Sequence, residues 1–273
     1  MKKLMTFAIL CFSAVAVARN PFLSPEFQNL LEQAEADNAE MQFEVGKRYY
    51  MGEGVPSDKP QGISWLEKSA AAGYIPAQRA LGILFLDGDG TSVPANATKG
   101  LEWLTKAAEK NDLNAMTLLI ALYKEGKLVP QDYAKAISWA EKGAVLGDRD
   151  AQYYLGTFYH FGLGKEKDIS LAAKLYTQAA NQGHLEALNN IGAMYFGGIG
   201  VDKNQVLGYT YWLLAKSLGS PHAERNLQAK AGELSDQEKA KAENAVRRLV
   251  AQMNGEPEPQ AQPQRRSKKS KKK

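Results

Sequence analysis

The side chains that could catalyse a reaction or hold a metal are scarce in this chain. Its 273 residues include three histidines and a single cysteine, Cys11. His184 and His222 each come shortly after a glycine that would end a helix, which favours a turn role over metal ligation. We find no HExxH motif, Ser/His/Asp order, paired carboxylates or dinucleotide-binding glycine fingerprint. The sequence therefore predicts a protein with no catalytic residue, metal or cofactor, and not an enzyme.

Glycine-rich segments are a second source of chemistry, because such loops can cradle a phosphate. An aromatic-x-x-Gly-x-Gly pattern begins at Tyr49, Phe85, Tyr159 and Tyr195. None of the four copies ends in the lysine and serine or threonine of a phosphate-binding loop, and each follows a predicted helix. We therefore interpret these glycines as chain reversals, where a residue of positive φ is needed.

The glycine pattern belongs to an internal repeat. Equivalent alanines occur at Ala77, Ala115, Ala151, Ala187 and Ala223, with steps of 38, 36, 36 and 36 residues. The long first step indicates a two-residue insertion in the second unit, between residues 89 and 96. Aspartate or asparagine recurs at the same steps and is typical of helix N-caps; these residues are Asp58, Asn96, Asp132, Asp168 and Asn204.

Each unit predicts a pair of helices. In the first helix of the second unit, Ala77, Leu81 and Phe85 share one face. A glycine within that helix costs about 1 kcal/mol relative to alanine, so its recurrence in four units implies that another backbone comes close. These central glycines are Gly46, Gly82, Gly156 and Gly192.

The pattern A-x-x-x-L-G-x-x-Y-x-x-G-x-G, followed by W-x-x-K-A-A, resembles the Sel1-like repeat, a relative of the tetratricopeptide repeat. The resemblance covers residues 39–219 in five units, and the third unit departs from it at Ile120 and Leu128, where the other units have glycine. It implies an all-α fold, a right-handed α-solenoid of about five helix-turn-helix repeats. We expect a capping segment over 19–38 and capping helices over 220–254, including a polar helix at 236–253.

The resemblance also implies a concave groove, lined by positions three before, one after and four or five after each central glycine. Its aromatic and polar composition is typical of a peptide-binding surface. For Phe43 and Phe196, packing between repeats is an equally good interpretation. The candidate groove residues are Phe43, Lys47, Tyr50, Arg79, Lys124, Tyr153, Thr157, His160, Phe161, Asn189 and Phe196, and Met51 and Ile83 occupy equivalent positions.

The beginning of the chain is typical of an export signal. Two lysines, an apolar run from Leu4 to Val17 and a small-x-small site ending at Ala18 predict a signal peptide over 1–18. An uncleaved anchor is the alternative, but about 15 apolar residues fall short of the roughly 20 that cross a bilayer. We expect a cleaved protein without a transmembrane anchor, exported to a bacterial periplasm.

The net charge of +4 arises from the last residues of the chain. The last nine residues carry seven cations: Arg265, Arg266, Lys268, Lys269, Lys271, Lys272 and Lys273. The rest of the chain is therefore net negative, which disfavours nucleic-acid binding. Residues 255–273 predict a disordered proline/glutamine linker and basic tail. The tail is either a solvated solubilising segment or, as we favour, a contact to an anionic envelope surface.

Two functions are compatible with these features. The first is a non-enzymatic scaffold that binds a protein or peptide in its groove, during assembly or regulation of a cell-envelope machine such as a secretion or motility apparatus. The second is an envelope-attached structural or hydrolase-associated factor, whose basic tail contacts peptidoglycan or anionic lipid. A hydrophobic fraction of 44% supplies a buried core in either case.

Overall fold

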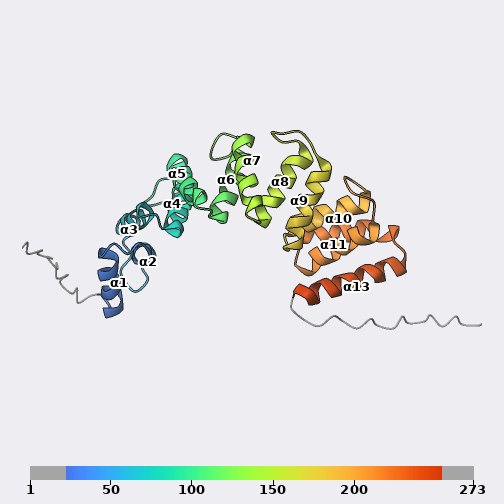
Figure 1. The fold of residues 1–273 in the computed structure, drawn as a ribbon. Helices are drawn as coiled ribbons and strands as arrows, with labels where there is room; N and C mark the ends of the chain where they lie inside the picture. Colours follow the sequence, from blue (N-terminus) through green and yellow to red (C-terminus); the bar gives the residue numbers. More distant parts are fainter. Residues whose placement is uncertain (1–22, 254–273) are drawn as a thin grey trace, which may run out of the picture. The chain divides into compact units, whose positions relative to one another are not determined.

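The computed structural model describes residues 23–253, and every regular element in that range is a helix. The predicted signal peptide and the basic tail lie outside the described residues. The chain forms two compact units, with the boundary between Lys110 and Asn111. The first unit contains α1 (Pro25–Glu35), α2 (Ala39–Met51), α3 (Lys59–Ala71), α4 (Ile75–Asp87) and α5 (Ala97–Glu109) (Figure 1).

The second unit continues the same helix pairs. It contains α6 (Leu113–Glu125), α7 (Tyr133–Val145), α8 (Arg149–Phe161), α9 (Ile169–Asn181), α10 (Leu185–Gly197), α11 (Gln205–Ser217), α12 (Pro221–Lys230), the 3-10 turn η1 (Ala231–Glu233) and α13 (Asp236–Met253). Consecutive helices contact each other from α1 to α5 and from α6 to α12. The predicted all-α repeat fold is confirmed.

The predicted cap residues begin and end the helices. Each predicted Asp or Asn N-cap accepts a hydrogen bond from the backbone N–H three residues on, as Asn96 does from Lys99 at 3.0 Å. These bonds satisfy donors that the first turn of a helix leaves free. Where the other units end a helix with glycine, Asn111 takes the left-handed conformation with φ of 66°.

The central glycines allow the two helices of a repeat to touch. A Cβ on Gly208 of α11 would lie 2.5 Å from the carbonyl oxygen of Gly192 and 2.7 Å from the backbone nitrogen of Phe196 in α10. A Cβ on Gly82 of α4 would lie 2.6 Å from Leu104 of α5. The close approach expected from the recurring glycines is confirmed.

The third repeat keeps its two helices in contact by placing the large residue on the first helix and the small one on the second. Ile120 of α6 stands where the other first helices have glycine, and it is fully buried. The residue in register with Leu104 is Ala140 of α7, also fully buried in the same cluster. A large residue opposite a small one conserves volume, so α6 and α7 remain in contact.

The predicted terminal helices cover the ends of the array. The Phe27 ring of α1 is buried and meets Tyr49 of α2 edge to face, with ring centroids 5.2 Å apart. The polar helix expected at 236–253 is α13, which contacts α11 and buries Ala242. Between residues 23 and 253, no helix has both the length and the apolar character required to cross a membrane.

Substitution of Gly208 by alanine tests the helix contact. Alanine normally favours a helix by about 1 kcal/mol over glycine. Here its Cβ would press against the backbone of α10, so we expect Gly208→Ala to lower the free energy of unfolding by about 1–3 kcal/mol. Urea unfolding followed by circular dichroism measures the change.

Gly232 provides the control for that substitution. A Cβ at Gly232 meets nothing within 4 Å, so Gly232→Ala is expected to leave the unfolding midpoint unchanged or slightly raised. An unfolding midpoint of Gly208→Ala at or above that of the unsubstituted protein would contradict the packing account.

Candidate functional site

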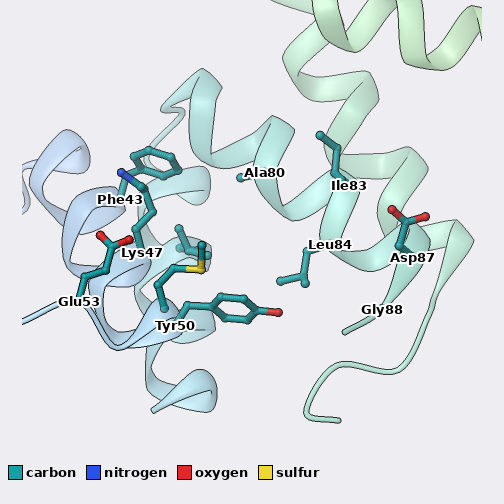
Figure 2. Close-up of a pocket in the computed structure, with 11 residues that line it drawn as sticks. Phe43, Lys47, Tyr50, Glu53, Ala80, Ile83, Leu84, Asp87 and Gly88 are labelled. Atoms are coloured by element: carbon teal, nitrogen blue, oxygen red, sulfur yellow. The ribbon is translucent and has the colours of Figure 1, made fainter. Parts of the chain in front are cut away.

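A pocket of about 400 Å³ lies between α2 and α4 in the first unit (Figure 2). Phe43, Lys47, Tyr50 and Glu53 reach it from the α2 side, and Ala80, Ile83, Leu84 and Asp87 face them from α4. The volume falls within the range of about 300–1,000 Å³ that is usual for ligand sites. The full lining is Phe43, Lys47, Tyr50, Met51, Glu53, Leu66, Ala80, Ile83, Leu84, Asp87 and Gly88.

The size of two side chains explains why the pocket is open. Ala80 lies two residues before the central glycine of α4, and it is the smallest side chain at that position in the five repeats. The equivalent residues are Glu44, Leu118, Tyr154 and Asn190. Leu66 lies beneath the pocket on α3, in register with Tyr176 and Trp212 of the later repeats. The second and third repeats have Leu104 and Ala140 in this register but are followed by the larger Leu118 and Tyr154, so only here is leucine combined with alanine, which leaves this space.

Large apolar side chains are accessible around this space. Met51 is 65% exposed and Ile83 is 41% exposed. Phe43 is half-buried and packs against Tyr74, with ring centroids 5.5 Å apart. An apolar hollow with accessible rims is the form that side-chain docking requires.

A carboxylate outside the pocket fixes the position of Tyr50. The Tyr50 hydroxyl donates to Asp89 Oδ2 at 3.1 Å, and Lys59 Nζ donates to the same oxygen at 2.9 Å. The other oxygen, Oδ1, accepts the backbone N–H groups of Thr91, Ser92 and Val93 at 2.7–3.0 Å. These backbone hydrogen bonds, together with the lysine, hold the pKa of Asp89 well below its usual range.

The two-residue insertion predicted from the repeat spacing forms the loop that surrounds Asp89. The insertion lies in the loop between α4 and α5, and its backbone closes around the Asp89 carboxylate. The Asp89 side chain is only 6% exposed and pairs with Lys59 at the start of α3. The loop therefore ties the second repeat to the first and orients one wall of the pocket.

The other aromatic candidates lie in the second unit. Tyr153 stacks on His184 with ring centroids 4.3 Å apart, and His160 stacks on Phe161 at 4.6 Å. Phe161 is 62% exposed. Lys124 Nζ lies 5.5 Å from the Tyr154 ring centroid. Burial lowers the pKa of His160, so its ring favours the neutral form.

Neighbouring side chains bury two of the predicted groove residues in this structure. Phe196 is 4% exposed and stacks on Trp212 at 5.1 Å. Thr157 is also buried, and its Oγ1 accepts a hydrogen bond from the Tyr176 hydroxyl at 3.3 Å. Both residues serve packing and offer no accessible surface to a partner.

Two further candidates lie outside the pocket. Asn189 is half-buried, and its Oδ1 accepts a hydrogen bond from Asn226 of α12 at 2.8 Å. Arg79 is half-buried on α4 and does not line the pocket. The structure thus brings together Phe43, Lys47 and Tyr50 from the predicted set.

The histidines do not form a metal site in the described part of the chain. His184 is the N-cap of α10, and its Nδ1 accepts the backbone N–H of Ala187 at 3.2 Å. Burial lowers its pKa, which favours the neutral ring that this hydrogen bond needs. His222 lies in the first turn of α12 beside Arg225. No group of three or more potential ligands occurs among residues 23–253.

Sequence reasoning missed six of the eleven residues that line the pocket. Ala80 and Leu84 lie outside the groove positions taken from tetratricopeptide arrays, and Glu53 lies in a loop. Asp87 occupies the position five after Gly82 but was not among the candidate residues. A comparison of side-chain sizes between repeats would have singled out Ala80, because no other unit has so small a residue there. No signal in the repeat pattern marks Glu53.

Five consecutive matches to the Sel1 repeat profile confirm the family that the sequence pattern suggested. They cover residues 39–74, 75–112, 115–148, 149–184 and 185–220. The chain belongs to the Sel1 repeat family. Proteins of this family are generally protein–protein interaction scaffolds and are typically non-enzymatic.

Solved bacterial structures share the fold. A Sel1 repeat protein from Oxalobacter formigenes is 28% identical, with a TM-score of 0.63 over 83% of this chain and 91% of that chain. A protective antigen present in uropathogenic Escherichia coli strains is 26% identical, with a TM-score of 0.66 over 85% of this chain. This chain spans about half of the antigen, 53% of its length. No curated protein matches the chain.

Replacement of Asp89 by asparagine tests the contacts that hold Tyr50. The pKa of Asp89 is lower in the folded protein than its ordinary value of about 3.9. Its ionised form therefore stabilises the fold above that pH, and this contribution is lost as the pH falls below it. We expect Asp89→Asn to lower the melting temperature at neutral pH, with a difference that shrinks below about pH 4.

Thermal unfolding by circular dichroism between neutral and acidic pH measures this difference. Asp87→Asn removes the same charge from an exposed side chain two residues earlier and is expected to melt like the unsubstituted protein. Equal melting temperatures of Asp89→Asn and the unsubstituted protein at neutral pH would show that the network does not stabilise the fold.

Proposed function

We propose that this protein is a non-enzymatic scaffold that holds a segment of a partner protein in the pocket between α2 and α4. The observation that carries the proposal is an open, mostly apolar hollow on a repeat array whose equivalent spaces are filled by Tyr176 and Trp212 in later repeats. The scaffold role of the family agrees with such a site.

The cellular setting is part of the same proposal. The signal-like residues 1–18 support export to the periplasm of a bacterium, where the scaffold assists assembly or regulation of a cell-envelope machine. The basic residues at 265–273 provide a contact to peptidoglycan or anionic lipid, which would hold the scaffold near the envelope. The pocket and the tail have separate tasks in this arrangement.

Photocrosslinking in cells tests the binding surface. A photoreactive amino acid at position 51 places the probe on the pocket rim, and one at position 161 places it on the exposed aromatic surface of α8. Position 142 on α7 is the control, because Lys142 stacks over Trp139 on a second helix. We expect a discrete adduct from position 51 and none from position 142, and mass spectrometry of the adduct identifies the partner.

A variant that fills the pocket tests whether the crosslinked adduct depends on it. Leucine occupies the position equivalent to Ala80 in the third repeat, so Ala80→Leu suits the helix while reducing the space. This variant should abolish the adduct, whereas Ala71→Leu, on the exposed surface of α3, should retain it. An adduct from position 161 alone, or one that persists in Ala80→Leu, would refute the assignment of the pocket.

A further inference from the structure

The pocket rim carries two carboxylates that have no ion-pair partner among the described residues. Glu53 follows the end of α2 and Asp87 is the last residue of α4, and both are exposed. They lie on opposite sides of the pocket (Figure 2). The carboxyl ends of α2 and α4 add the negative partial charge of a helix C-terminus to the same rim.

The cations near the pocket are already paired. Lys47 Nζ lies 2.9 Å from Glu44 Oε2 on the same helix, and Lys59 Nζ lies 2.9 Å from Asp89 Oδ2. Glu44 also pairs with Arg48, which meets Glu26 as well, so the nearby cations are balanced by Glu44, Glu26 and Asp89, none of which lines the pocket. The unmatched charge left at the rim is the negative charge of Glu53 and Asp87.

The interior of the pocket suits an apolar group, whereas its rim suits a cation. Its lining is mostly aliphatic and aromatic, and Ala80 and Leu66 leave room for a branched or aromatic side chain. The Tyr50 wall is held in place by Asp89, so little ordering of the pocket is required on binding. An apolar interior between two anionic edges fits an apolar group flanked by a cation.

We propose that the pocket selects partner segments in which a bulky apolar side chain is adjacent to lysine or arginine. The apolar side chain enters between Phe43 and Ile83, and the neighbouring cation meets Glu53 or Asp87. This proposal rests on the proposed function, because it names the class of segment that the scaffold holds. Charge complementarity at the rim is the observation that distinguishes it from general apolar docking.

The chain's own tail does not meet both requirements. Residues 254–273 are rich in cations but contain no Leu, Ile, Val, Met, Phe, Tyr or Trp. They therefore offer the rim a charge but offer the pocket no anchor. The proposed occupant is therefore a segment of another protein rather than this tail.

Selection from a displayed library of random dodecapeptides tests the proposal with the full-length exported protein. We expect enriched peptides to share a Leu, Ile, Met, Phe or Trp within two positions of Lys or Arg. Enrichment should be absent with Ala80→Leu and retained with Ala71→Leu. An enriched peptide is then synthesised with its lysine or arginine unchanged or replaced by glutamine, and both forms are titrated by fluorescence anisotropy.

The charge contribution is measured with the double variant Glu53→Gln/Asp87→Asn, which keeps the shape of the rim. We expect the cationic peptide to bind this variant about three- to tenfold more weakly, as exposed ion pairs allow. The neutral peptide should bind the variant and the unsubstituted protein within about twofold of each other. The preference for the cationic peptide should also decline as salt concentration rises.

The possible outcomes separate this proposal from the proposed function. Apolar peptides enriched without a neighbouring cation, or affinities unaffected by the double variant, would overturn the cation preference and leave the scaffold function intact. Absence of any enrichment above the Ala80→Leu background would refute both. A dimer in light scattering that Ala80→Leu dissociates would assign the pocket to a second copy of the chain and also overturn the proposal.

Discussion

The close approach of two helices within each repeat is the constraint on which the rest of the structure depends. Four first helices have a glycine where the second helix crosses, and the third repeat replaces this arrangement with Ile120 opposite Ala140. Because the backbones lie so close, the residue opposite each glycine reaches toward the opposite face of the first helix. Its size, together with the size of the side chain that faces it from the next first helix, then determines how much space is left.

The pocket results from the sizes of the side chains near this helix contact. Leucine at position 66 leaves a space that Tyr176 and Trp212 occupy in the fourth and fifth repeats, and alanine at position 80 widens it. Asp89 then fixes the Tyr50 side of the space through contacts that a simple turn could not supply. A few side chains and one short insertion therefore create the pocket in an otherwise regular repeat structure.

The sequence was sufficient to predict the helices, because their determinants are local. The N-cap residues, the chain reversals and the left-handed Asn111 each act within a few residues of their position. The central glycines were also informative, since their cost within a helix demands a compensating contact. For these reasons both helices of each repeat occur where the sequence pattern placed them.

The site was only partly predictable, because exposure depends on contacts between helices. Thr157 and Phe196 occupy groove positions by register, yet Tyr176 and Trp212 cover them. Lys47 and Tyr50 occupy the equivalent positions in the first repeat and remain accessible, where the shorter Leu66 replaces those two rings. The role of Asp89 was hidden for the same reason, since its partners Tyr50 and Lys59 are 39 and 30 residues away.

The most direct test of the account is methyl NMR spectroscopy of the full-length protein during titration with a selected peptide. The account predicts that the methyl signals of Met51 and Ile83 shift in proportion to peptide bound. Those of Met116 and Met194, which are buried in the second unit, should remain in place. Shifts confined to the second unit, with Met51 and Ile83 unchanged at saturation, would contradict the claim that the α2/α4 pocket holds the partner.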